Sequence, residues 1–87
     1  AQYCFTSCNG IDLVNGLTFS TDLDITLIRA CRKNCNKLVV LADHTKFGMT
    51  YYFKTLSIKE IDIIITDQEP EEKWITYCEE NGITLIY

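Results

Sequence analysis

The feature that most constrains the fold is an uninterrupted apolar run at residues 38–42, Leu-Val-Val-Leu-Ala, which ends abruptly in Asp43. Five apolar residues, two of them β-branched, are too few to span a membrane but fit a strand buried on both faces of a parallel sheet. A short polar loop with a lysine and a glycine follows at 43–48. Because ligands of open α/β sheets bind outside the carboxyl ends of the strands, this run predicts both a fold class and the position of a binding site.

The remaining segments alternate between strand-like and helix-like patterns. Strands are predicted at 2–6, 37–43, 50–55, 62–67 and 83–87, and helices at 22–35 and 70–81. The strand at 62–67 is expected to be fully buried and, like the strand at 37–43, to end in a carboxylate. The order strand, helix, strand implies right-handed parallel crossovers. The predicted fold class is therefore α/β, with a mainly parallel sheet flanked by helices.

Capping residues and turn signals set the predicted boundaries. Ser20 or Thr21 is expected to cap the first helix, whose apolar stripe is predicted to contain Leu23 and Leu27, widened by Ile28.

The second helix is expected to begin near Pro70 and to end at Asn81, with Gly82 free to adopt the left-handed conformation. Residues 7–18 carry two Asn-Gly turn signals and are predicted to be a loop, since the four residues between the signals are too few to predict strand pairing.

Length and charge narrow the class of protein. At 87 residues the chain is one domain or part of one. Its net charge is −4, and only the basic residues between Arg29 and Lys37 cluster, so we expect any contact with DNA to come from another segment of the whole protein. No apolar run approaches the roughly 20 residues of a membrane span, so no membrane contact is expected.

The five cysteines predict reduced thiols in a cytoplasmic protein. An odd number excludes complete internal pairing, and the Cys-x-x-x-Cys spacing, found twice, matches neither a redox Cys-x-x-Cys motif nor a zinc ribbon. His44 is the only histidine, and nothing in the spacing brings it to a thiol as a nucleophilic pair. No metal or cofactor is expected.

Two groups of polar residues could form a site. Asp43 could accept hydrogen bonds from sugar hydroxyls and Lys46 could hold a phosphate or carboxylate, although Asp43 could instead cap the following turn, with Lys46 solvated. Asn9, Gly10 and Asp12 follow the first strand and reach the same edge if the strands are parallel; the alternative is a plain turn. Asp67 ends a further strand at this edge and is interpreted as the cap of the helix near residue 70.

Taken together, these stretches resemble one protein family. The segments 7–12, 16–18, 43–48 and 61–67, which include Asp-His-Thr-Lys-Phe-Gly and Ile-Thr-Asp, occur in the order and spacing of DeoR-type bacterial transcriptional repressors. They resemble the C-terminal effector-sensing domain, and the similarity covers nearly all of the chain. That domain is related in fold to ribose-5-phosphate isomerase and glucosamine-6-phosphate deaminase. Thr45 stands where family members commonly have serine, and Ser7 where they often have a smaller residue.

The resemblance implies a non-enzymatic role. A phosphorylated sugar would bind to a pocket lined by Asn9, Gly10, Asp12, Asp43 and Lys46, and binding would alter the repressor's hold on its operator. The family's helix-turn-helix domain and the first part of its sensing domain are not in this sequence. We therefore expect residues 1–87 to be the C-terminal portion of the sensor, with DNA contacted only through the missing domain.

Two alternatives remain open. A sugar-phosphate isomerase or deaminase of related fold would need a positioned acid or base, and Asp12 and Asp43 are the plausible candidates. A third possibility is a module that serves only oligomerisation. A truncated sheet would expose hydrogen-bonding edges and apolar faces, so the chain is expected to form a dimer or higher homo-oligomer.

Overall fold

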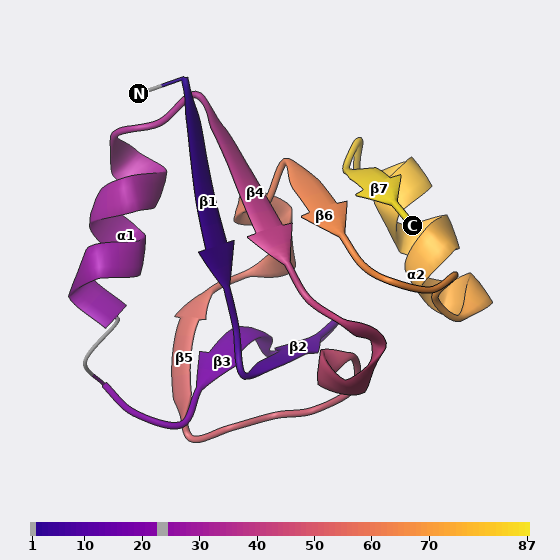
Figure 1. Ribbon diagram of the computed structural model, residues 1–87, viewed down its shortest axis with the longest axis horizontal. Coiled ribbons are helices and arrows are strands. Elements are labelled where there is room, and N and C mark those ends of the chain that lie inside the picture. The colour runs from indigo at the N-terminus through magenta and orange to yellow at the C-terminus, as the bar shows by residue number, and fades with distance from the viewer. Residues whose placement is uncertain (1, 23–24) are drawn as a thin grey trace.

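The chain folds around a four-stranded parallel sheet, with strand order β1-β4-β6-β7. The computed structural model describes residues 2–22 and 25–87. The strands of this main sheet are β1 (Tyr3–Ser7), β4 (Lys37–Leu41), β6 (Ile63–Ile65) and β7 (Thr84–Ile86), and they run side by side in Figure 1. Each neighbouring pair is parallel, which confirms the predicted α/β class.

A second, antiparallel sheet lies at the carboxyl end of β1. It contains β2 (Gly10–Asp12), β3 (Gly16–Phe19) and β5 (Phe53–Leu56) in the order β2-β3-β5 (Figure 1). The prediction of a loop over 7–18 is therefore wrong, because β2 and β3 form a hairpin. Asp12 closes the turn by accepting the Val14 N–H. The hairpin is also stabilised by the pairing of β3 with β5, which is distant in the sequence and cannot be predicted from local residue patterns.

Two helices cover one face of the main sheet. α1 (Ile25–Lys33) links the hairpin to β4, and α2 (Glu72–Glu80) links β6 to β7. The start of the first predicted helix and the position of Leu23 fall on residues 23–24, outside the described residues. The prediction of Leu27 in the apolar stripe is wrong, because its side chain is 61% exposed. Ile28, which is predicted to widen the stripe, is buried and packs into the core.

The second helix ends close to where the sequence predicts. Gly82 has a φ of +69°, the left-handed conformation expected of a residue that stops a helix. Two single turns of 3₁₀ helix complete the connections, η1 (His44–Lys46) after β4 and η2 (Ile58–Glu60) before β6. No helix among the described residues is long and apolar enough to cross a membrane.

The two faces of the main sheet differ in burial. Leu38, Val40 and Ile64 are fully buried beneath the helices and the second sheet. On the opposite face, Ile63 and Ile65 are only half-buried, so the prediction of a fully buried strand over 62–67 is wrong for alternate residues. On this second face Val39 is buried, but Leu41, which the sequence predicts to be buried, is 44% exposed. The continuous core therefore lies on the face of Leu38, Val40 and Ile64.

A polar clamp fixes the amino ends of β4 and β6. The Asp62 Oδ2 atom accepts hydrogen bonds from the Leu38 N–H at 2.7 Å and from the Arg32 guanidinium at 2.6 Å. Arg32, in the last turn of α1, also donates to the carbonyl oxygens of Glu60 and Cys35 at 2.8 and 3.1 Å. One guanidinium thus ties α1 to the segments that lead into both strands.

The clamp favours the ionised form of Asp62. Desolvation by itself would raise the pKa of this carboxyl, but the Leu38 N–H and the Arg32 guanidinium outweigh it and lower the pKa. A lowered pKa in the folded state means that the clamp stabilises the fold fully above the unfolded value, about 3.9, and that this contribution is lost as the pH falls through the folded value.

We predict that Arg32→Met lowers the free energy of unfolding at neutral pH by about 1.5–3 kcal/mol, because it removes charge-assisted hydrogen bonds to a partly buried carboxylate. Arg29→Met is the matched control, since Arg29 lies exposed on the same helix. Urea unfolding followed by circular dichroism measures both variants. Equal stability of the two would contradict the clamp.

Candidate functional site

Polar and charged side chains collect where β4 and β6 end. Asp43 follows β4, His44 and Lys46 lie in η1, and Asp67 follows β6. Because β4 and β6 are parallel neighbours, their carboxyl ends meet at one edge of the sheet. We refer to these four residues as the edge cluster.

Asp43 both caps η1 and pairs with Lys46. Its Oδ1 atom accepts hydrogen bonds from the Thr45 N–H at 2.9 Å and from the Thr45 hydroxyl. Its Oδ2 atom lies 3.7 Å from the Lys46 Nζ, and both side chains are more than a third exposed. The hydroxyl and the N–H of Thr45 lower the pKa of Asp43, so this carboxylate stays ionised at neutral pH. The capping role expected as an alternative is therefore real, and Lys46 remains accessible to a ligand.

His44 and Asp67 form the second pair of the edge cluster. The His44 backbone N–H donates to Asp67 Oδ1 at 2.7 Å, and the His44 Nδ1 lies 2.9 Å from Asp67 Oδ2. The hydrogen bond from the His44 side chain is the main reason for a lowered pKa of Asp67. The interpretation of Asp67 as a helix cap is wrong, because Glu71 occupies the N-cap position of α2.

Sequence reasoning missed this pair, although the signal was available. Two neighbouring parallel strands each end in an aspartate, and a histidine follows the first of them directly. Residues at the ends of adjacent parallel strands meet, so the second carboxylate could have been assigned to the first loop. Asp67 instead fastens η1 to the end of β6.

The other three expected site residues lie in or beside the hairpin. The Asn9 Oδ1 atom accepts the Ser20 N–H at 2.9 Å. Asp12 accepts the Val14 N–H at 3.0 Å and the Thr50 hydroxyl at 2.9 Å, and the Val14 N–H is the largest cause of its lowered pKa. Both side chains are therefore engaged by the protein's own loops.

Gly10 is needed for a close approach within the protein. A Cβ atom at this position would lie 2.3 Å from the Met49 carbonyl oxygen, so no larger residue fits without a shift of the backbone. The hairpin nevertheless lies against the loop that follows η1, because the Gly48 N–H donates to the Ile11 carbonyl at 2.8 Å. The structure thus pairs Asp43 directly with Lys46. It joins the hairpin to the loop that follows η1 through the Gly48–Ile11 backbone hydrogen bond and through the hydrogen bond from the Thr50 hydroxyl to Asp12.

Cys8 is buried close to this edge. Its side chain is 5% exposed, and burial raises the pKa of its thiol to about 12, with smaller and opposing effects from Lys46 and Asp43. A thiol with this pKa is protonated at neutral pH and cannot act as a nucleophile. All five cysteines are free, and no group of three or more potential metal ligands occurs within 2–22 and 25–87.

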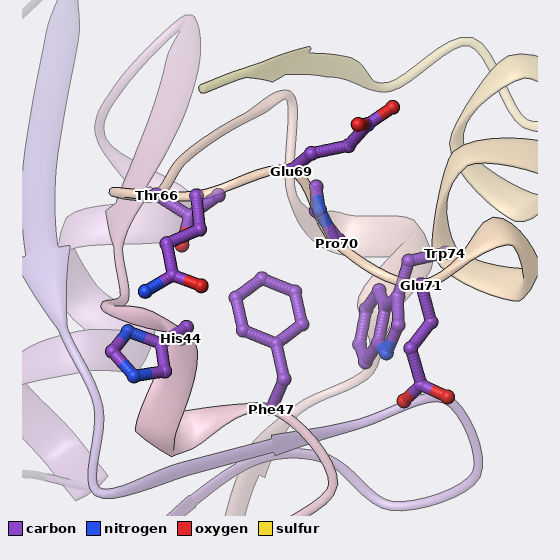
Figure 2. Close-up of a pocket in the computed structure, with 8 residues that line it drawn as sticks. His44, Phe47, Thr66, Glu69, Pro70, Glu71 and Trp74 are labelled. Atoms are coloured by element: carbon purple, nitrogen blue, oxygen red, sulfur yellow. The ribbon is translucent and has the colours of Figure 1, made fainter.

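A hollow of about 150 Å³ opens beside the edge cluster, between η1 and the segment that connects β6 to α2 (Figure 2). The Phe47 ring stands edge-on to Trp74, with ring centroids 4.8 Å apart, and Pro70 closes one side. His44 and Glu71 supply polar groups at its rim. A second, more open groove lies at the carboxyl ends of β4 and β6 and is lined by Leu41, Ala42, Asp43, Ile65, Thr66 and Asp67.

An α/β domain with its charged groups gathered at the carboxyl edge of a parallel sheet has the arrangement of a small-molecule-binding domain. The family model described as the DeoR C terminal sensor domain matches residues 1–68. Since this match covers most of the chain, the protein belongs to the DeoR C-terminal sensor domain family. The family resemblance expected from the sequence is confirmed.

The relatives of this chain are transcription regulators. It is 29% identical to the HTH-type transcriptional repressor GlcR of Bacillus subtilis (strain 168) over 72 residues, 83% of this chain and 28% of that protein. It is 38% identical to the HTH-type transcriptional regulator GolR of Listeria innocua over 69 residues, 79% of this chain and 27% of that protein. It is 26% identical to the deoxyribose operon repressor of Escherichia coli (strain K12) over 83 residues. The chain spans about a third or less of the length of these relatives.

We predict that Cys8 resists alkylation. A rise in pKa from 9.0 to about 12 reduces the thiolate fraction at pH 8 roughly a thousandfold, and burial slows access further. Iodoacetamide labelling followed by mass spectrometry should modify the half-buried Cys31 long before Cys8. Both should react alike in urea. Equally fast labelling of the two in the folded protein would contradict the burial of Cys8.

Proposed function

We propose that this chain is the effector-sensing part of a DeoR-family transcriptional repressor and that its effector is a phosphorylated sugar. The observation that carries the proposal is the accessible Lys46 ammonium beside Asp43, at the carboxyl ends of β4 and β6. A mobile ammonium suits a phosphate, and an ionised carboxylate suits sugar hydroxyls. In this proposal Lys46 binds the phosphate and Asp43 binds a hydroxyl.

The hairpin residues take supporting roles in this proposal. Asp12 has an oxygen that already accepts the Thr50 hydroxyl and could accept a sugar hydroxyl in its place. The Asn9-Gly10 segment lies at the start of β2 and would form a wall of the pocket. The weak ion pair of Lys46 with Asp43 would be exchanged for the phosphate, which costs little because exposed pairs contribute about 0–1 kcal/mol.

Effector binding would act on DNA at a distance. This chain has a net charge of −4, and its basic residues cluster only between Arg29 and Lys37, so operator binding is assigned to a helix-turn-helix domain elsewhere in the whole cytoplasmic protein. The names of the relatives support this assignment, since they describe HTH-type regulators. The effector must bind the two states of the repressor with different affinity in order to shift them. A homo-oligomer is the expected form of the whole protein.

The alternative of a sugar-phosphate isomerase or deaminase is not favoured. Asp12 and Asp43 are its candidate acid and base, but hydrogen bonds lower the pKa of both, chiefly from the Val14 N–H to Asp12 and from the Thr45 hydroxyl to Asp43. A general acid or base works best with a pKa near the operating pH. Two carboxylates held ionised as turn caps suit binding better than proton transfer.

We predict that a matching pentose or hexose phosphate raises the melting temperature of the whole protein. At 100 times the dissociation constant, binding stabilises the folded state by about 2.7 kcal/mol. Lys46→Ala should abolish the shift, whereas the control Lys59→Ala should keep it, because Lys59 is exposed in η2, which precedes the amino end of β6. The unphosphorylated sugars should produce no shift. An unchanged response of Lys46→Ala would place the phosphate elsewhere.

A further inference from the structure

Two thiols meet at the amino end of the main sheet. Cys4 lies opposite the buried Leu38 in the register of β1 and β4, so both side chains are on the face that the helices cover. Cys35 lies in the connection from α1 to β4. The Gln2 carbonyl accepts the N–H groups of the two residues after Cys35, at 3.2 and 2.9 Å. These hydrogen bonds hold the start of β1 against that connection, as Figure 1 shows near the amino terminus.

Both thiols donate to the last turn of α1. The Cys4 Sγ lies 3.5 Å from the Cys31 carbonyl oxygen, and the Cys35 Sγ lies 3.9 Å from the Arg32 carbonyl oxygen. These two carbonyls belong to consecutive residues, which brings the two sulfurs to the same end of the helix. Burial chiefly, and then a side-chain hydrogen bond with Cys4, raise the pKa of Cys35. Thiols are weak donors, so little is lost when the two sulfurs turn towards each other.

The two cysteines differ in their access to solvent. Cys4 is half-buried, whereas Cys35 is 8% exposed and packs into the core. Redox-sensing cysteines are often accessible thiols next to a second cysteine, which resolves the first oxidation product. All five cysteines are free in the structure, so this pair is in its reduced state.

We propose that a hydroperoxide oxidises Cys4 and Cys35 to an intramolecular disulfide, so that the pair is a redox modification site of this domain. With hydrogen peroxide, the deprotonated Cys4 sulfur attacks one peroxide oxygen and the O–O bond breaks. Cys4 becomes a sulfenic acid, and the departing hydroxide leaves as water with the proton that Cys4 lost. The Cys35 sulfur then attacks the Cys4 sulfur and displaces its hydroxyl group, which leaves as a second water with the Cys35 proton. Two thiols are oxidised, and one peroxide is reduced.

Proximity offsets the low reactivity of the buried partner. A thiol with a raised pKa has a small thiolate fraction at neutral pH, which slows its attack on a separate molecule. Here the target sulfur is held beside Cys35, and well-oriented groups within one molecule react as if at very high concentration. Burial and Cys4 raise the pKa of Cys35, and the Arg32 guanidinium opposes them; it donates to the Cys35 carbonyl at 3.1 Å.

Cys31 is the competing partner for Cys4. It lies one helical turn before Cys35, but it contacts Cys4 through its backbone carbonyl and not through its thiol. The two pairings can be told apart by the peptides that the bridge joins. Trypsin cleaves after Arg32 and Lys33, which places Cys31 and Cys35 in separate peptides.

A bridge between Cys4 and Cys35 has a structural consequence. It closes a loop over residues 4–35, which contains β1, the hairpin and α1. Such a closure restricts the unfolded chain and so stabilises the folded one. The bridge lies at the amino ends of β1 and β4, whereas the edge cluster lies at the carboxyl ends of β4 and β6. The proposal therefore does not depend on the effector or on its site.

Peptide mapping of the oxidised whole protein tests the proposal. The protein is treated with a small excess of hydrogen peroxide, its remaining thiols are blocked with iodoacetamide in urea, and it is digested with trypsin without a reductant. We expect Cys4 linked to Cys35, in a peptide pair lighter by two hydrogen atoms than the two reduced peptides together. Fragmentation of the pair separates Cys4 from Cys8, which lies on the same tryptic peptide. A bridge from Cys4 to Cys31, a bridge between molecules, or no bridge at all would overturn the proposal.

Two matched variants separate the roles of the cysteines. Cys35→Ser should stop the reaction at the sulfenic acid of Cys4, which dimedone traps as a stable adduct. Cys31→Ser is the control and should form the same bridge as the unmodified protein. Oxidation should raise the melting temperature of the unmodified protein by several degrees and leave that of Cys35→Ser unchanged. A Cys35→Ser protein that responds to peroxide like the unmodified protein would also overturn the proposal.

Discussion

The geometry of this domain depends on the Asp62 carboxylate, which is held by the Leu38 N–H and the Arg32 guanidinium. This interaction aligns β4 with β6 at their amino ends and fastens α1 across them. Since strands rise by a nearly constant length per residue, alignment at one end fixes alignment at the other. The carboxyl ends of β4 and β6 therefore lie next to each other, and there the His44 N–H donates to Asp67.

Much of this arrangement is visible in the sequence. The apolar run at 38–42 predicts a buried strand, which is correct except at Leu41, whose side chain is 44% exposed. The aspartate that follows the run marks the edge where the charged groups gather. The sequence does not show which distant segments pair as strands. The β2–β3 hairpin was missed because its strands are only three and four residues long and β3 is completed by β5, more than thirty residues later. The misplacement of Leu27 has a similar cause, since the neighbours of α1 decide which side of it is buried.

The candidate site, like the fold, can be predicted from the sequence only in part. Residue type and position correctly place Asp43 and Lys46 at one edge, and the structure brings their charges within 3.7 Å. The sequence could not show that Asn9 and Asp12 accept hydrogen bonds from nearby loops. These contacts depend on where the fold places Ser20 and Thr50 relative to the hairpin. Nor could it show that Gly10 is required by the Met49 carbonyl. Polar residues that are candidate ligands in the sequence can be needed to stabilise the turns that shape a site.

If a sugar phosphate binds at the edge cluster, amide hydrogen exchange of the whole protein should detect it there. The His44 and Thr45 amides donate to the two aspartates of this edge, so both report on it. Exchange is compared with and without the sugar phosphate that gives the largest thermal shift. We expect slower exchange over 43–48 and at Asp67, with little change in η2. Protection confined to segments remote from β4 and β6 would mean that the sugar phosphate binds elsewhere.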